Sequence, residues 1–334
     1  MTNAILARIA RLALLAVLAV VGFPSPGPGR GAARAAEKIS MGVIGTGSAQ
    51  QWALWIADTK GFLKANGLEL DVVVTPSAAA VMQQILAGSI QIGSAGLTSP
   101  MRAIDQGIAV AVLGIETQAA PYSIWAKPAL KAMSELKGRT IIVGGAKDIT
   151  RTYLERMLVP AGVPKDQYDL IYAGSASARF AALSAGAVDA AMLNPPFSFK
   201  AQADGFSNLG NLTDTVQMPF TGYVVASAWA RANRSALSGF ANAIAKGVDW
   251  FNDDANRDEA IEIQRKVSSA DRADVAATYD LYRKLKVFPR KGTLADSQLG
   301  TIIKALQDVG ELDGAPDLAR FIDPEISAIV ASVK

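Results

Sequence analysis

The 334-residue chain contains no cysteine and no histidine. Without cysteine there is no disulfide framework, no thiol nucleophile and no N-terminal cysteine for a lipid anchor. Without histidine the usual zinc sites and the Ser-His-Asp and Cys-His types of catalysis are excluded. We therefore expect no metal site and no cofactor, and among enzymes only carboxylate- or lysine-based chemistry remains open.

Acidic residues are absent from the first 35 positions. Arg8 and Arg11 precede the apolar run LALLAVLAVVGF (12–23), and a stretch rich in proline and glycine leads to Ala33-Arg34-Ala35. A basic start, a short apolar run and an A-x-A sequence are typical of a secretory signal peptide. We expect export to the periplasm as a soluble protein, with cleavage near Ala35. A retained membrane anchor is the alternative, although the apolar run is short for a bilayer.

The excess of positive charge also comes from this first segment. The chain has 33 basic and 30 acidic residues, and four of the arginines lie within positions 1–35. Residues 36–334 consequently carry 29 basic and 30 acidic side chains. No basic stripe remains that would indicate a nucleic-acid partner. Half of all residues are hydrophobic, which is typical of a globular protein, and the length suggests about two domains.

One short pattern occurs twice. Residues 83–93 read QQILAGSIQIG and residues 180–190 read FAALSAGAVDA, each with an Ala-Gly pair near its middle. In each copy an apolar, helix-like stretch passes through Ala-Gly into a short strand-like run. The predicted elements around the two copies also follow the same order. The sequence therefore predicts two α/β lobes built on one plan.

Strands and helices alternate in both halves. In the first half we predict strands at 38–45, 68–75, 90–96 and 109–116, and helices at 52–68, 81–88 and from Ser99-Pro100 onward. In the second half we predict strands at 140–145, 168–175 and 188–194, and helices at 146–163 and 177–186. This alternation favours a mainly parallel sheet, flanked by helices, in each lobe.

A last strand at 221–230 and a long helical tail follow. The tail has too few strands for a third lobe, so we expect it to pack on the first. The chain would cross to the second lobe near 119–127 and return near 217–224, which makes a hinge with a cleft between the lobes. We assign 36–122 and 222–334 to lobe 1, 123–221 to lobe 2 and 1–35 to the signal peptide.

Residues 38–334 resemble the periplasmic solute-binding proteins of ABC importers, in the class that binds nitrate, sulfonates, taurine and thiamine precursors. The resemblance rests on an ordered set of segments: DTKGFLKANGL, LAGSIQIGSAGLTSPMRAIDQG, LKGRTIIVGGAKD, LSAGAVDAAMLNPPF and YVVASAWARAN. It implies a two-lobed, type II periplasmic-binding-protein fold that closes on a small solute. It also implies an ABC permease in the inner membrane as the partner. We expect a monomer.

Candidate ligand-binding residues lie on the loops after the strands, because ligands bind beyond the carboxyl ends of strands in such sheets. Glycines let backbone N–H groups approach a ligand, helix starts favour anions, and an arginine can hold a carboxylate or sulfonate through two hydrogen bonds. The predicted residues are Thr46, Gly47, Gln50, Trp52, Ser94, Thr98, Glu116, Thr117, Lys147, Asp148, Thr150, Arg151, Ser175, Asn194, Phe197 and Tyr223.

Several of these residues also have a plain structural interpretation. Gln50 could serve in helix capping, Trp52 and Tyr223 in core packing, and Asp148 as an N-cap or ion-pair partner of a nearby cation. The prolines before Phe197 could simply form a rigid turn.

The expected function is capture of a small anionic solute, of the sulfonate, nitrate, taurine or carboxylate type, without turnover. No histidine or charged motif in the loops selects one anion, so a thiamine-precursor-like heterocycle or an aromatic acid is an alternative. An enzyme of the same fold is another alternative. The thiamine-pyrimidine synthases that the fold resembles consume an active-site histidine, which this chain lacks. A sensor protein could also replace the permease as the partner.

Overall fold

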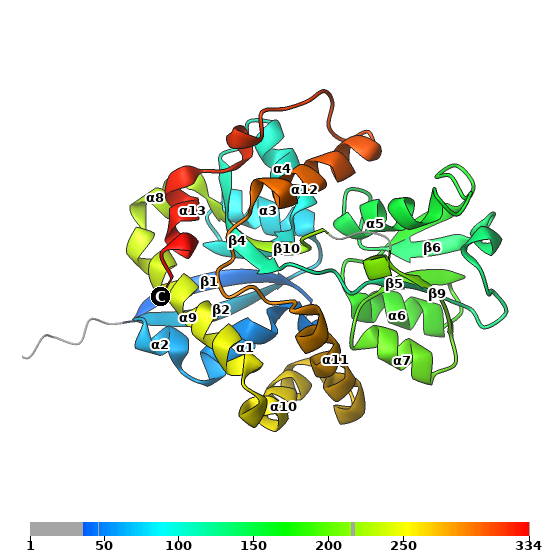
Figure 1. Cartoon of the computed structure of the whole chain (residues 1–334), viewed down its shortest axis with the longest axis horizontal. Coiled ribbons are helices and arrows are strands. Elements are labelled where there is room, and N and C mark those ends of the chain that lie inside the picture. Colours follow the sequence, from blue (N-terminus) through cyan, green and yellow to red (C-terminus); the bar gives the residue numbers. More distant parts are fainter. Residues whose placement is uncertain (1–35, 46, 215–217, 334) are drawn as a thin grey trace, which may run out of the picture. The chain divides into compact units, whose positions relative to one another are not determined.

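The computed structural model describes residues 36–45, 47–214 and 218–333. The predicted signal peptide (1–35) and Thr46 lie outside these residues. Within the described part the chain forms two five-stranded sheets, which Figure 1 shows with their helices. We call each sheet with the helices that cover it a lobe. The fold is the predicted two-lobed α/β arrangement.

The first sheet has the strand order β2-β1-β3-β10-β4. Its strands are β1 (Glu37–Ile44), β2 (Leu68–Thr75), β3 (Ile92–Gly96), β4 (Val110–Thr117) and β10 (Thr221–Ala226). The second sheet has the order β7-β6-β8-β5-β9, from β5 (Ser123–Ala126), β6 (Thr140–Val143), β7 (Asp169–Tyr172), β8 (Ala190–Leu193) and β9 (Ser207–Asn211).

The two sheets are built on one plan. In each, four strands run in one direction and one runs antiparallel to both of its neighbours: β10 between β3 and β4, and β5 between β8 and β9. The repeated Ala-Gly pairs join equivalent elements: helix α3 (Ala78–Leu86) to β3, and helix α6 (Ala176–Ser184) to β8. Gly88 and Gly186 have φ values of 71° and 73°, which only glycine adopts readily.

The chain passes from the first sheet to the second after Thr117 and returns before Thr221. The lobe boundaries given above stay a prediction.

Three helices surround the second sheet: α5 (Ile149–Leu158), α6 (Ala176–Ser184) and α7 (Phe197–Ala203). The first lobe carries α1 (Trp52–Thr59), α2 (Phe62–Ala65), α3 (Ala78–Leu86) and α4 (Thr98–Asp105). The predicted helix at 52–68 is thus two helices, which part at Gly61 with φ of 73°. Short 3-10 turns are η1 (Ala49–Gln51), η2 (Met133–Leu136), η3 (Leu212–Asp214), η4 (Asp254–Asn256) and η5 (Leu318–Phe321).

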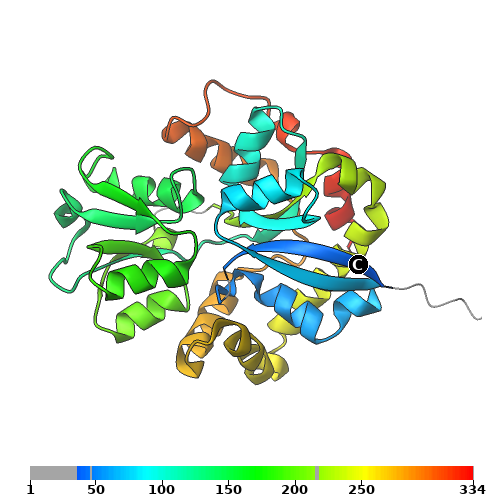
Figure 2. The ribbon, with the colours of Figure 1, turned by 180° about the vertical axis from the view of Figure 1, so that it is seen from behind.

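The C-terminal tail supplies α8 (Ser227–Ala232), α9 (Arg234–Asn252), α10 (Arg257–Ser268), α11 (Arg272–Leu285), α12 (Asp296–Asp308) and α13 (Pro324–Ala331). Helix α9 packs on α1 and α2, and α13 packs on β4. Helix α11 also contacts α7 of the second lobe. Figure 2 shows the same ribbon from behind. The tail therefore contacts both lobes, not the first alone.

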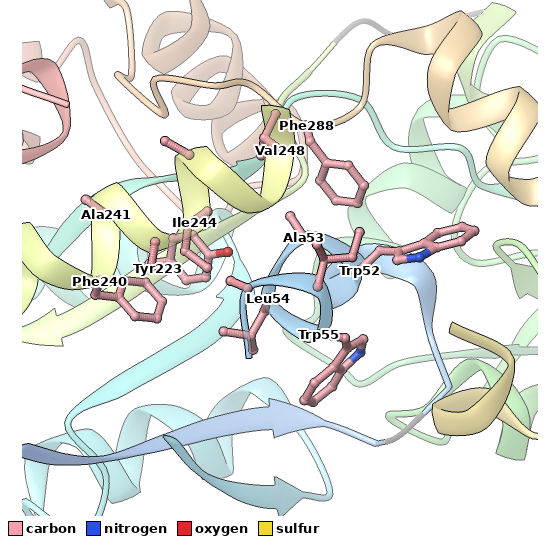
Figure 3. Packing of buried hydrophobic residues seen from close by; sticks show 14 of the residues in the cluster. Trp52, Ala53, Leu54, Trp55, Tyr223, Phe240, Ala241, Ile244, Val248 and Phe288 are labelled. Carbon is pink, nitrogen blue, oxygen red and sulfur yellow. The ribbon is translucent and has the colours of Figure 1, made fainter. Parts of the chain in front are cut away.

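Aromatic and aliphatic side chains from α1, α9 and α11 form the core of the first lobe. Figure 3 shows Trp52 and Leu54 of α1 among Ile244 and Val248 of α9. A second cluster is shared between the lobes, with Met101 of α4, Tyr153 of α5 and Leu306 of α12. Burial of this shared apolar surface stabilises the junction of the lobes, at roughly 25 cal/mol per Å².

Candidate functional site

A small cavity lies where the two lobes meet. Its volume is about 30 Å³, which is room for roughly two water-sized groups. The first lobe lines it with polar side chains from the β1–α1 connection and β3, and the second lobe with side chains from the starts of α5 and α6 and the end of β8. The principal polar lining residues are Ser48, Gln50, Ser94, Thr150, Ser175 and Asn194.

Hydrogen bonds cross this cavity from one lobe to the other. Asn194, just after β8, donates from Nδ2 to Ser48 Oγ at 3.0 Å and to Gln50 Oε1 at 3.3 Å. Its Oδ1 has no hydrogen-bond partner among the described residues, although Asn194 is fully buried. A buried acceptor without a partner is costly, so the cavity offers Asn194 Oδ1 to a donor on a solute or to water.

Three glycines let the lobes approach closely. A Cβ on Gly174 would lie 2.0 Å from the carbonyl oxygen of Pro76, and one on Gly96 would lie 2.7 Å from Cγ2 of Ile149. A Cβ on Gly45 would lie 2.8 Å from Cβ of Ser175. Each of these contacts joins the first lobe to the second. The structure is therefore a closed arrangement, and a larger side chain at Gly174, which would meet backbone atoms of Pro76, would push the lobes apart.

Arg179 is a buried cation on the wall of the cavity. It lies in α6 with 1% of its surface exposed. Its guanidinium donates to three backbone carbonyl oxygens, those of Met192 (2.7 Å), Ala173 (3.0 Å) and Gly174 (2.7 Å). No carboxylate of the described residues forms an ion pair with it. Burying an unpaired charge costs several kcal/mol, so a solute anion would supply the missing counter-charge.

Tyr122 completes this side of the cavity. Arg179 Nη2 lies 3.4 Å from the Tyr122 hydroxyl, and the guanidinium sits 5.9 Å from the centre of the tyrosine ring. Burial raises the pKa of Tyr122 to about 12, although Arg179 opposes the shift. The tyrosine therefore stays neutral and can donate its O–H into the cavity.

Two helices begin at the cavity wall. Asp148 caps α5, because its Oδ1 accepts the Thr150 backbone N–H at 2.9 Å. Ser175 caps α6, because its Oγ accepts the Ala178 backbone N–H at 3.2 Å. Both capping residues line the cavity. The positive end of the α6 dipole thus reinforces the charge of Arg179 and favours an anion, whereas the Asp148 carboxylate already compensates the start of α5.

A chain of polar side chains lies behind Ser94. Gln51 Nε2 donates to Ser94 Oγ at 3.1 Å, and the Ser94 hydroxyl donates to Glu116 Oε2 at 2.5 Å. Glu116 is 4% exposed, and its Oε1 has no partner among the described residues. Burial raises the pKa of Glu116 to about 7, although the hydrogen bond from Ser94 opposes the shift.

Six of the predicted site residues line the cavity. They are Gln50, Ser94, Asp148, Thr150, Ser175 and Asn194. Two more lie directly behind it: Glu116 beneath Ser94, and Thr117, whose Oγ1 lies 2.7 Å from that of the lining residue Thr221. The structure brings these eight residues together, and they come from both lobes.

Trp52 and Tyr223 lie in the core rather than at the cavity. The Trp52 ring is fully buried and packs 5.2 Å from the ring of Phe251, and its Nε1 donates to the Ala260 carbonyl at 2.8 Å. The Tyr223 ring packs edge-on against Phe240 at 5.0 Å, as Figure 3 shows. Both aromatic side chains therefore serve in core packing, and neither lines the cavity.

Arg151 and Lys147 also lie outside the cavity lining. Arg151 Nε donates to Glu155 at 2.7 Å and its Nη1 to the Ala146 carbonyl at 2.7 Å, so its guanidinium is held by its own helix and the preceding loop. Lys147 borders a separate, wider groove of about 650 Å³, which it shares with Asp148.

The remaining predicted residues have local roles. The Gly47 carbonyl accepts from Gln264 at 3.3 Å, and the Phe197 ring packs 6.2 Å from that of Phe180. Thr98 begins α4 and is fully buried. The helix that was predicted with Ser99 as its N-cap and Pro100 as its first residue therefore starts two residues earlier, after Leu97, whose N–H pairs with the Phe220 carbonyl.

Sequence reasoning did not find four polar lining residues: Ser48, Tyr122, Arg179 and Thr221. One feature of the sequence could have indicated Arg179: it is the only charged residue in the α6 sequence ASARFAALS. A lone charge on a helix that must pack against a sheet indicates a specific partner.

No helix among residues 36–45, 47–214 and 218–333 is both long and apolar enough to cross a membrane.

Comparison with known proteins gives a family and a fold. Residues 48–257 match the model of the family described as NMT1/THI5 like. The chain is 21% identical over 296 residues to the putative binding protein YtlA of Bacillus subtilis (strain 168), covering 84% of this chain and 86% of that protein.

Solved structures with the same fold include two proteins of bacterial origin. The ligand-binding component of an ABC-type import system from Staphylococcus aureus superposes with a TM-score of 0.73 at 14% identity, over 87% of this chain and 98% of that one. The alkanesulfonate-binding protein SsuA from Xanthomonas axonopodis pv. citri, bound to MOPS, gives a TM-score of 0.68 at 20% identity, over 89% and 98%.

Proposed function

Because this chain belongs to the NMT1/THI5-like family, we propose that it is a solute-binding protein that captures a small anion between its lobes without turnover. The observation that carries this proposal is the buried guanidinium of Arg179, which lines the cavity and has no carboxylate partner among the described residues. An anion at this place would gain a charge-assisted hydrogen bond and the field of the α6 start.

The closed contact of the lobes supports capture by lobe closure. Every solute enclosed here would be contacted by both halves of the chain, through Ser48 and Gln50 on one side and Arg179 and Asn194 on the other. Such binding stabilises the closed arrangement, because the solute contacts exist in full only when both walls are present.

The protein would act in the periplasm, as a monomer, and pass its solute to an ABC permease. The predicted signal peptide and the fold shared with an ABC import component from Staphylococcus aureus support this proposal. The solute class would be a small acid of the sulfonate, nitrate, taurine or carboxylate type. The small cavity favours an acid group as the part that enters it.

The test is a thermal-shift screen of residues 36–334, without the predicted signal peptide. The panel holds nitrate, bicarbonate, taurine, ethanesulfonate, acetate, benzoate and a thiamine-precursor pyrimidine. A ligand at 100 times its dissociation constant stabilises the folded state by about 2.7 kcal/mol, which raises the melting temperature measurably. We expect one of the acids to do this, with saturable binding and full recovery of the unchanged ligand by mass spectrometry.

Other outcomes of the screen separate the alternatives. Stabilisation by the pyrimidine alone would mean that the solute is a neutral heterocycle and not an anion. A ligand that is chemically changed after incubation would establish an enzyme. No stabilisation by any compound, in protein that is first unfolded and refolded to remove bound material, would contradict the proposal.

A further inference from the structure

Glu116 is a buried carboxyl group that the proposed site does not yet use. It lies at the end of β4, one layer behind the cavity, and forms no ion pair with any cation of the described residues. The titratable groups that sense its charge are Tyr223 of β10 and Tyr282 of α11, and burial raises the pKa of both above the ordinary range. Neither tyrosine can neutralise a carboxylate at this position.

The hydrogen bonds of Ser94 depend on whether Glu116 holds a proton. A serine hydroxyl has one donor and two acceptor positions. With ionised Glu116, the Ser94 O–H donates to the carboxylate and Ser94 Oγ accepts from Gln51, so Ser94 has no donor left for the cavity. With a proton on Glu116, the carboxylic acid donates to Ser94 Oγ. The Ser94 O–H is then free to donate to a solute in the cavity that Ser94 lines.

We propose that Glu116 is a proton-dependent positioning residue, so that an anionic solute binds together with one proton, which rests on Glu116 and turns the Ser94 hydroxyl toward the anion. This inference rests on the proposed function. The proton comes from solvent and returns to it when the solute leaves. A second anion close to ionised Glu116 in a buried site is disfavoured, so the same proton also removes a repulsion. The raised pKa of Glu116 agrees with this arrangement, because it allows protonation near neutral pH.

Proton uptake is measured by isothermal titration calorimetry of residues 36–334 at pH 8, in buffers that differ in their enthalpy of ionisation. The probes are nitrate, acetate and ethanesulfonate. We expect uptake approaching one proton for each anion bound, and an affinity that falls about tenfold for each pH unit above the pKa of Glu116.

Two variants separate the proton from the hydroxyl. Glu116→Gln carries an amide N–H that can donate to Ser94 and cannot ionise, so it should show no proton uptake and the same affinity at pH 6 and pH 8. Ser94→Ala should bind several-fold more weakly at pH 6 and take up less of a proton at pH 8 than the wild type, because loss of the Ser94 O–H raises the pKa of Glu116 in the free protein. The matched control is Glu155→Gln, which removes the other buried glutamate of the described residues and should keep the uptake of the wild type.

A ligand-free readout tests the proton itself. The infrared band of a protonated carboxylic acid, taken as the difference between the wild type and Glu116→Gln, should titrate near neutral pH and move to higher pH when the bound anion is present.

The outcomes distinguish the inference from the proposed function. Anion binding without proton uptake, or a missing infrared band at pH 6, overturns the inference alone. An unchanged affinity of Ser94→Ala at pH 6 overturns the role of the hydroxyl. Failure of all three anions to bind at any pH overturns both the inference and the anionic form of the proposed function.

Discussion

Asn194 in the second lobe donates a 3.0 Å hydrogen bond to Ser48 in the first, across the wall of the cavity. Because its two partners come from different lobes, the bond exists only while the lobes are closed. It therefore belongs to the free energy of closure rather than to the stability of either lobe.

This bond can be measured by a double-mutant cycle of Asn194→Ala and Ser48→Ala. We expect a coupling of about 0.5–1.5 kcal/mol in the free energy of solute binding, the usual net worth of a buried hydrogen bond. Calorimetric titration of the four proteins with the anion found by screening gives the coupling. Strictly additive effects of the two substitutions would show that the bond is absent when solute is bound.

Arg179→Met should weaken binding of an anionic solute by about 1.5–3 kcal/mol, because it removes a charged hydrogen-bond donor from the cavity wall. Arg179→Lys should recover only part of this, since a lysine lacks the planar guanidinium fork. Affinity is measured by calorimetry at constant ionic strength. Arg151→Met is the matched control: the Arg151 guanidinium is already held by Glu155 and Ala146, so binding should not change. A larger loss of affinity for Arg151→Met than for Arg179→Met would show that the anion binds near Arg151 and not near Arg179.

The paired lobes could be predicted from the sequence because most strands of the common plan are apolar enough to recognise. Strand β2 was predicted at 68–75, where the structure has it, from the run LELDVVVT. Strand β9 was missed, since SNLGN contains one large apolar residue and lies at the edge of its sheet. The place of β10 between β3 and β4 depends on long-range pairing that no local pattern encodes.

The candidate site was predictable only in part, for a similar reason. Loops that follow parallel strands gather at one edge, which placed Ser94, Ser175 and Asn194 together. The first turn of a helix does not reveal which of its faces meets the core, so Trp52 was expected in the cleft and lies in the apolar cluster. Arg179 lies one turn into α6, and only the packing of that helix brings it to the cavity.

Gly174→Ala should oppose closure of the lobes. Its new Cβ would lie 2.0 Å from the backbone carbonyl of Pro76, which cannot move without shifting the first lobe. We expect at least a tenfold loss of solute affinity, about 1.4 kcal/mol, and a larger radius of gyration by small-angle X-ray scattering. Gly300→Ala is the control, because a Cβ there meets nothing within 4 Å. Unchanged scattering and affinity would mean that the two lobes do not need this contact.

Trp52→Ala should lower the free energy of unfolding by about 3–5 kcal/mol, the usual cost of removing a buried tryptophan. The ring fills space beside Phe251 and Tyr279, and its N–H has a partner in the Ala260 carbonyl. Urea unfolding followed by circular dichroism measures this loss. Trp52→Phe keeps most of the volume and should cost less. If Trp52→Ala has normal stability but no longer binds the solute, Trp52 contacts the solute after all.

Glu116 should make the stability of the solute-free protein fall as the pH rises. Its ordinary pKa is 4.5 and burial raises the folded value to about 7. Between these values the folded state holds a proton that the unfolded chain has lost, so the free energy of unfolding decreases with pH across this window and is level above it. The total loss is about 2–4 kcal/mol.

Glu116→Gln does not ionise, so its stability relative to the wild type should rise by that amount between pH 4.5 and pH 8. Urea titrations at half-unit steps of pH measure the difference, with the exposed Glu259→Gln as the control. A constant difference across the window would mean that the ionised carboxylate is stabilised inside the protein by a group or a water that accepts its charge.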